Sequence, residues 1–152
     1  MPWTRIYGNK TEFEKMSAKE PGLRGLTYRE ALLESTSQML DSDRSVFVIG
    51  EGVDDSGGVF GTTKGLHAKF GKDRVMDSPL AENAVTGIAI GAALAGMRPI
   101  LVHMRVDFMP LAMDQIINHA AKWRYMFGGK LSVPLVVRSI IGRGWGSAAQ
   151  HS

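Results

Sequence analysis

Two acidic residues of this chain lie in positions that suit chemistry. Glu82 interrupts an apolar stretch, and the neighbours it would have on one helical face are small or apolar: Ala81, Val85, Thr86 and Ala89. An unpaired carboxylate in such surroundings is costly, because burial penalises a charge that has no partner. Glu82 is therefore a candidate functional acid. The structural alternative is a first-turn carboxylate that the positive end of the helix dipole stabilises.

The second acidic residue, Glu51, follows an apolar run from Val46 to Ile49 and stands between Gly50 and Gly52. Such a run is typical of a strand that is covered on both faces. Ligands of open parallel sheets sit outside the carboxyl ends of the strands. Glu51 is thus either a functional carboxylate or a turn residue that points into water, and its position alone favours neither.

Other side chains give weaker signals. The four histidines show no metal-ligand spacing and the chain has no cysteine, so metal catalysis by this chain alone is not expected. His103 is interpreted as a strand-end histidine held by a backbone partner, and His119 as a surface or interface residue. The loop from Asp54 to Thr63 contains glycines but lacks the spacing of a nucleotide phosphate loop, and we interpret it as a flexible rim.

Alternating strand and helix signals position these residues. Apolar runs predict strands near residues 46–49, 74–76, 99–103 and 133–138. Thr27 and Glu30 form a capping box, which predicts a helix over residues 28–41. That helix is expected to bury Ala31, Leu32, Thr36 and Met39 or Leu40. Ser78 and Pro79 predict a second helix start, and further helices are expected at 63–70 and 110–126. The pattern predicts an α/β fold, a parallel sheet with helices on both faces.

The length of 152 residues suits one domain or most of one. Residues 1–25 are polar and aperiodic, so we interpret them as an extension or linker with at most a short helical turn. Residues 26–152 are expected to form the domain. Its tail, residues 142–152, is a glycine-rich loop, and a sheet domain is not expected to end in this way. The fold is therefore expected to be incomplete at its C-terminus.

Composition and charge exclude several classes of protein. With 44% hydrophobic and 22% charged residues the chain resembles a soluble globular protein. The net charge is +3, but basic and acidic residues alternate, so nucleic-acid binding is not expected. The longest uncharged apolar run, from Val85 to Met97, is too short for a membrane span. The N-terminus has no apolar signal core, and we expect a cytoplasmic location.

A series of short motifs carries a family resemblance over residues 27–152. In chain order the motifs are TYREAL from Thr27, VIGE from Val48, DSPLAE from Asp77, TGIAIGAA from Thr86, GMRPI from Gly96, MDQIIN from Met113 and AAQHS from Ala148. In order and spacing they resemble the beta subunit of the E1 component of 2-oxo acid dehydrogenase complexes. The resemblance implies the pyrimidine-binding domain of the transketolase-like, thiamine diphosphate-binding fold.

The resemblance also implies roles for individual residues. Glu82 matches the glutamate that hydrogen-bonds the aminopyrimidine ring of the cofactor, and its apolar surroundings are expected to raise its pKa. Phe108 matches an aromatic residue that packs on the pyrimidine, with Met104 beside it. Glu51 matches an acid of the proton path between two cofactor sites. His151 matches a catalytic histidine that handles the acyl intermediate and the incoming lipoyl group.

The same resemblance implies partners. The Gly-Asp-Gly and distant Asn motif that holds diphosphate and magnesium does not occur in this chain, and in the family it lies on the alpha subunit. We therefore expect an alpha-type E1 partner, an alpha2beta2-like assembly and a lipoyl-bearing E2. Leu111 departs from the glutamine of typical members, and those members continue past the Gln-His-Ser motif.

The implied reaction is oxidative decarboxylation of pyruvate or a related 2-oxo acid, with acyl transfer to lipoyl. Two alternatives stay open. One keeps the cofactor but makes the chain half of a transketolase-like or deoxyxylulose phosphate synthase-like enzyme. The other is a non-catalytic docking module for an alpha-type partner, because an incomplete sheet leaves an open edge.

Overall fold

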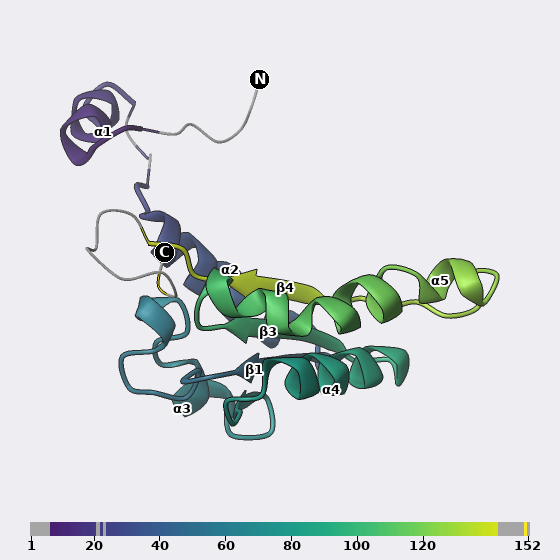
Figure 1. Ribbon diagram of the computed structural model, residues 1–152. Helices are drawn as coiled ribbons and strands as arrows, with labels where there is room; N and C mark the ends of the chain where they lie inside the picture. Colours follow the sequence, from purple (N-terminus) through teal and green to yellow (C-terminus); the bar gives the residue numbers. More distant parts are fainter. Residues whose placement is uncertain (1–6, 21, 23, 143–150, 152) are drawn as a thin grey trace.

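The computed structural model describes residues 7–20, 22, 24–142 and 151, and strands alternate with helices along most of them (Figure 1). The strands are β1 (Val46–Gly50), β2 (Val75–Asp77), β3 (Arg98–His103) and β4 (Val136–Ser139). The α-helices are α1 (Lys10–Ser17), α2 (Tyr28–Ser42), α3 (Leu66–Phe70), α4 (Glu82–Leu94) and α5 (Trp123–Met126). Two 3-10 helices, η1 (Val59–Gly61) and η2 (Val106–Ala112), and a π-helix, η3 (Gln115–Ala120), complete the described elements.

The four strands of the described residues form one parallel sheet in the order β2-β1-β3-β4. In Figure 1 the arrowheads of β1, β3 and β4 point the same way, so their carboxyl ends share one edge. The predicted fold class is confirmed. The last strand begins at Val136 rather than at residue 133, because Pro134 has no amide to donate and the N–H of Leu135 donates locally to the carbonyl of Val133.

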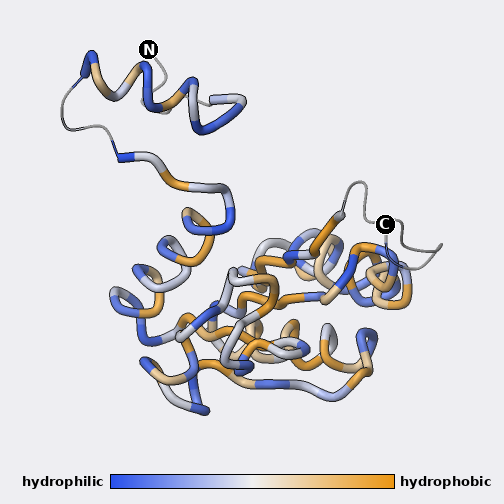
Figure 2. Tube along the Cα trace, turned by 90° about the vertical axis from the view of Figure 1, so that its left-hand side faces the viewer, coloured by the Kyte–Doolittle hydropathy of each residue, from blue (hydrophilic) through white to orange (hydrophobic). Residues whose placement is uncertain are grey.

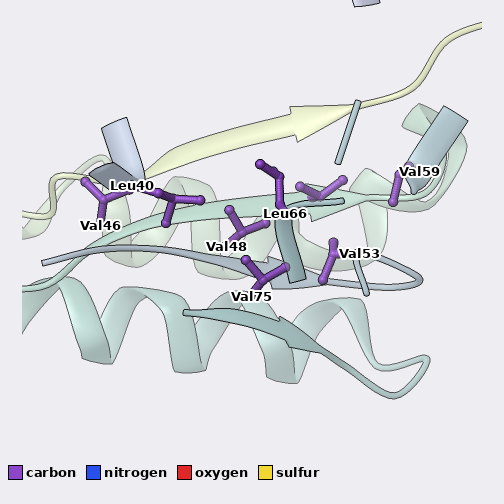
Figure 3. Packing of buried hydrophobic residues seen from close by; sticks show 8 residues of the cluster. Leu40, Val46, Val48, Val53, Val59, Leu66 and Val75 are labelled. Carbon is purple, nitrogen blue, oxygen red and sulfur yellow. The ribbon is translucent and has the colours of Figure 1, made fainter. Parts of the chain in front are cut away.

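Alternate residues of β1 face opposite sides of the sheet, so one strand supplies two cores. On one face Val46 and Val48 pack with Leu40 of α2 and Leu66 of α3 (Figure 3). The cluster on the other face involves helix α4 and consists of Phe47, Ile49, Val85, Ala89 and Leu101. All five residues of β1 are buried, as the continuous apolar run predicts.

Helix α2 begins as predicted. The N–H of Glu30 donates to Thr27 Oγ1 over 3.3 Å, and the N–H of Thr27 donates to Glu30 Oε2 over 2.8 Å. Thr36 and Leu40 are buried, which confirms two of the expected positions. Of the alternatives Met39 and Leu40, Leu40 is thus the buried one, and Met39 is 45% exposed. Ala31 is exposed, so that expectation is wrong, and Leu32 is half-buried. Figure 2 shows hydrophobic and hydrophilic colours alternating along this helix, whose inward face is narrow.

The N-terminal segment contains more structure than the sequence led us to expect. Helix α1 runs for eight residues, whereas we predicted at most a short turn. The N–H of Glu12 donates to Asn9 Oδ1 and the N–H of Gly8 donates to Glu12 Oε2, each over 2.9 Å. This reciprocal capping explains the helix. None of its residues is buried, and Figures 1 and 2 both show it apart from the sheet.

The predicted start of the fourth helix is wrong by several residues. Helix α4 begins at Glu82, with Ala81 as its N-cap, and not at Ser78 or Pro79. The N–H of Ser78 donates to the carbonyl of Gly50 over 3.2 Å, which continues the pairing of β2 with β1. Ser78 is therefore held in sheet-like geometry and cannot cap a helix.

Two further expectations about the connections are wrong. The loop after β1 is anchored in the core rather than a loose rim: Val53 and Val59 are buried, and the N–H of Val59 donates to Thr63 Oγ1 over 2.8 Å. The predicted helix over residues 110–126 is divided among η2, η3 and α5. Within the described ranges, none of the helices is long and apolar enough to cross a membrane.

Candidate functional site

The carboxyl ends of the strands gather polar residues from separate parts of the chain. Gly50 of β1 lies in register with Asp77 of β2, and Glu51 follows it. His103 ends β3 on the other side of β1. Glu82 is the first residue of α4, which packs against both β1 and β3. We call Glu51, Asp77, Glu82, Thr86 and His103 the strand-end cluster.

The backbone at the end of β1 is held by close packing and one strong hydrogen bond. A Cβ added at Gly50 would overlap the carbonyl oxygen of Val102, so this position requires glycine. The N–H of Gly52 donates to Asp77 Oδ1 over 2.6 Å. A charged acceptor makes this a strong bond. Together these contacts fix the backbone on both sides of Glu51.

Glu51 and Glu82 meet across this edge of the sheet. Burial, followed by the charge of Glu82, a hydrogen bond with the Glu82 side chain and the charge of Asp77, raises the pKa of Glu51. Two carboxyl groups can hydrogen-bond only if one of them keeps a proton. The two side chains therefore interact at the mouth of helix α4, and this interaction favours the protonated form of Glu51.

The surroundings of Glu82 differ from the expected ones. The sequence predicts apolar neighbours for Glu82, but Glu82 is half-buried and faces Glu51 and His103 as well as the apolar side of its helix. The helical pattern could not predict this, because the polar neighbours arrive from the ends of other strands.

His103 is buried, with 2% of its surface exposed, and its partner is a side chain rather than the backbone partner we expected. Its Nε2 atom lies 3.4 Å from Oγ1 of Thr86, which is fully buried. The Thr86 hydroxyl donates over 2.6 Å to the carbonyl oxygen of Glu82. Burial lowers the pKa of His103, and the negative charge of Glu82 partly opposes this effect.

The other predicted site residues form a second group. The ring of Phe108 lies 5.9 Å from the ring of His151, at an interplanar angle of 87°. Phe108 belongs to η2, which packs against α4 and β3. Met104 is half-buried, and its terminal methyl would lie 3.3 Å from a Cβ added at Gly52, next to Glu51. Leu111 is 60% exposed.

The structure thus pairs Glu51 with Glu82 and Phe108 with His151, and η2 links the two pairs through its packing on α4. His119 is half-buried with its ring 5.1 Å from that of Trp123, so it is less exposed than a surface residue. Among the described residues, no group of three or more His, Asp or Glu side chains is arranged to hold a metal ion.

Known proteins show which family this chain belongs to. Residues 24–152 match the family model described as transketolase, pyrimidine binding domain. The chain belongs to this family. The beta subunit of acetoin:2,6-dichlorophenolindophenol oxidoreductase from Cupriavidus necator is 49% identical over 139 residues, which is 85% of this chain and 41% of that protein.

Two other relatives are E1-type beta subunits. The 2-oxoisovalerate dehydrogenase subunit beta of Bacillus subtilis is 46% identical over 84% of this chain and 39% of its own length. The mitochondrial pyruvate dehydrogenase E1 component subunit beta of Bos taurus is 44% identical over 87% of this chain and 37% of its own length. The chain therefore spans about two fifths of the length of the curated relatives it matches.

Three residues of the strand-end cluster were not identified as functional from the sequence. In the sequence, Asp77 is only the first residue of the DSPLAE motif, Thr86 belongs to the apolar helical face beside Glu82, and His103 is interpreted as a structural residue. One signal could have found two of them: Asp77 and His103 are the last residues of their strands, at the edge where ligands bind. Thr86 gave no such signal, because its role depends on the approach of α4 to β3.

Proposed function

We propose that this chain supplies the pyrimidine-binding half of a thiamine diphosphate site in an E1-type 2-oxo acid dehydrogenase. The observation that carries the proposal is the meeting of Glu51 and Glu82 at the carboxyl edge of a sheet in a member of the pyrimidine-binding family. The reaction is the oxidative decarboxylation of pyruvate or a related 2-oxo acid, with transfer of the acyl group to lipoyl.

The residues present fit this cofactor. The half-buried carboxyl group of Glu82 suits a hydrogen bond with a ring nitrogen of the aminopyrimidine. Phe108 and Met104 offer apolar surface to the same ring, and both are half-buried rather than sealed in the core. When bound, thiamine diphosphate supplies the nucleophilic carbon and the electron sink that a 2-oxo acid needs to lose carbon dioxide.

The protein contributes proton handling and orientation. Glu82 is the first residue of α4, and Glu51, whose pKa is raised by burial and by Glu82, lies beside it. A hydrogen bond between the two carboxyl groups would let a proton pass between them. Asp77 has a separate task, because its carboxylate is engaged with the N–H of Gly52 and fixes the strand end on which Glu51 stands.

The partners belong to the proposal as well. An alpha-type chain with the Gly-Asp-Gly and Asn motif holds the diphosphate and magnesium, and the two chains assemble in an alpha2beta2-like complex with a lipoyl-bearing E2. The contact of His151 with Phe108 supports a role for His151 beside the cofactor, in acyl transfer to lipoyl. We further propose that the complex works in the cytoplasm.

A non-catalytic docking module is the second candidate, and one observation favours it. Strand β4 is the outer strand of the described sheet, and it is at least partly exposed along its length, with Val136 55% exposed. An open edge and an exposed face are suited to a partner chain. In this case the chain binds an alpha-type partner, but the pair has no turnover.

The test compares variants in the complex of this chain with the alpha-type chain. We expect Glu82→Ala to lower decarboxylation of pyruvate or 2-oxoisovalerate by about a hundredfold or more and to weaken thiamine diphosphate binding in a calorimetric titration. Glu14→Gln, on the exposed helix α1, is the control. Unchanged cofactor binding in Glu82→Ala would refute the site, and a wild-type complex without turnover would favour the docking module.

His151→Ala separates the two halves of the reaction. We expect it to retain cofactor binding while lipoyl acylation falls. Full lipoyl acylation in this variant would remove His151 from the mechanism without affecting the assignment of Glu82.

A further inference from the structure

Helix α4 begins without the device that starts the other two long helices. The side chain of Asn9 caps α1 and that of Thr27 caps α2, whereas Ala81 precedes α4 and no side chain within the described part of the chain caps this helix. An uncapped first turn frays readily, because its amides lack partners. Glu82 is the first residue of that turn. Another contact must therefore fix the orientation of its side chain.

Two contacts of Thr86 hold this first turn. Its hydroxyl hydrogen is directed to the carbonyl oxygen of Glu82 at 2.6 Å, so Oγ1 has only lone pairs left to offer. His103 Nε2, 3.4 Å away, must then carry the hydrogen of this second, longer bond. Among the described residues, the charge of Glu82 acts on the imidazole, and burial lowers the pKa of His103. This pattern of contacts corresponds to a neutral ring with its hydrogen on Nε2.

We propose that His103 is a positioning residue that acts through Thr86 to hold the first turn of α4 and so directs the carboxyl group of Glu82 toward Glu51. We call the chain of contacts from His103 through Thr86 to Glu82 the relay. It connects the end of β3 with the start of α4, two elements that the sheet alone does not align. This inference rests on the proposed function only where it concerns catalysis. The relay itself is a property of the chain without cofactor or partner.

The first measurement identifies the hydrogen on His103. Long-range proton–nitrogen NMR spectra of the isotopically labelled 152-residue chain distinguish the two neutral tautomers, and His103→Gln assigns the signal by its loss. We expect the Nε2–H form at neutral pH. The Nδ1–H form, or a charged ring at that pH, would overturn the relay.

The second measurement asks whether the relay positions Glu82. Burial raises the pKa of Glu51, and Glu82 from α4 and Asp77 from β2 raise it further. The side-chain carbon signal of Glu51 reports this pKa. We expect Thr86→Val and His103→Phe to lower the pKa of Glu51 toward its ordinary value, because Glu82 moves away. Thr86→Ser keeps the hydroxyl and His103→Gln keeps an N–H donor. Both variants should retain the raised pKa of Glu51.

Controls distinguish positioning from general stability. His67→Gln is matched, because His67 Nδ1 lies 2.9 Å from the carbonyl of Val75 in β2 and does not contact α4 through this bond. It should leave the titration of Glu51 unchanged. An unchanged titration in Thr86→Val, which nearly preserves volume, would overturn the proposal even if His103→Phe failed to fold.

The complex with the alpha-type chain provides an independent reading. Loss of one hydrogen bond should weaken thiamine diphosphate binding about three- to tenfold in Thr86→Val but not in Thr86→Ser. If the wild-type complex binds no thiamine diphosphate, the proposed function fails while the NMR results still decide the relay. Equal binding by Thr86→Val and wild type would show that the relay has no role in catalysis.

Discussion

The two ends of the sheet differ in almost every physical respect. At the carboxyl ends, Glu51, Asp77 and Glu82 bring three acidic groups together beside a buried histidine. At the amino ends, a groove of about 460 Å³ lies between α2 and the starts of β3 and β4. Its lining is mostly apolar: Leu32, Met39, Val46, Pro99, Ile100, Val133, Pro134, Leu135 and Val136, with Ser35, Thr36, Arg98 and Arg138.

Among the described residues, the charged side chains that line this groove are those of two arginines, Arg98 and Arg138. In the amino-end groove Arg138 hydrogen-bonds with the hydroxyls of Thr36 and Thr62 over 3.3 and 3.4 Å, and burial lowers its pKa. The volume of the groove is in the range of ligand pockets, yet it gathers no acid and base that could exchange a proton. The comparison teaches that in this molecule the convergence of titratable groups, rather than the size of a hollow, marks the place for chemistry.

The largest expected effect concerns the packing at the carboxyl end. We expect Gly50→Ala to destabilise the chain by about 4 kcal/mol or more, because its Cβ would overlap the Val102 carbonyl in the centre of the sheet. Urea unfolding measures the loss. Gly57→Ala is the control, since a Cβ there meets nothing within 4 Å. Equal stability of both variants would mean that the end of β1 can move, and the fixed position of Glu51 would be lost with it.

The amino end should be less sensitive but still depend on one side chain. Arg74 donates to the backbone carbonyls of Leu40, Asp43 and Val46 over 2.7 to 3.0 Å, which ties the end of α2 to the sheet. We expect Arg74→Met to cost about 3 kcal/mol in urea unfolding, because three carbonyls lose a charged donor.

The control for that prediction lies on the same end of the sheet. Arg98 pairs with Asp43 at 3.4 Å, but its side chain is 59% exposed. We expect Arg98→Met to cost less than about 1 kcal/mol. If the two variants lost the same stability, the backbone contacts of Arg74 would contribute no more than a surface ion pair does.

Much of the fold follows from local signals in the sequence. The run from Val46 to Ile49 and the capping box of Thr27 and Glu30 each depend on neighbours within one element, and both predictions are confirmed. The start of α4 was missed for the opposite reason. Ser78 resembles a helix cap, but its N–H pairs with the distant Gly50, and a tertiary bond overrides the local preference.

The candidate site was predictable only in part. Glu51 and Glu82 could be found from their positions next to an apolar strand and within an apolar helix. Their mutual contact could not, because it depends on the distance between the end of β1 and the start of α4. Thr86 and His103 were missed for the same reason, since their spacing of seventeen residues has no helical or strand period.

Glu51, at the carboxyl end of the sheet, should make the stability of the chain depend on pH. The folded chain raises the pKa of Glu51, so folding favours the protonated form. The stability of the wild type should therefore fall as the pH rises from the ordinary glutamate range through the raised pKa, and stay constant above it. Glu51→Gln cannot ionise, and it should lack this fall and gain stability relative to wild type across the same window. Urea unfolding at a series of pH values measures the difference.

Glu14→Gln is the control for this titration, because Glu14 lies on the exposed helix α1 and pairs only at the surface with Lys10 at 3.7 Å. A gain of the same size and pH dependence in Glu14→Gln would mean that the effect reflects overall charge. A parallel pH profile for Glu51→Gln and wild type would contradict the raised pKa of Glu51. The two ends of the sheet would then differ only in packing.

The smallest expected effect is at the amino-end groove. Met39 contributes to its wall and is 45% exposed, so Met39→Gln should change the stability by less than about 0.5 kcal/mol. In the complex with the alpha-type chain we expect its affinity for thiamine diphosphate to stay within twofold of wild type, as measured by the same calorimetric titration. A tenfold loss would require the groove to communicate with the strand-end cluster through the sheet, because the two lie at opposite ends of β3. Such a loss would make volume, and not only the convergence of titratable groups, part of what identifies the site.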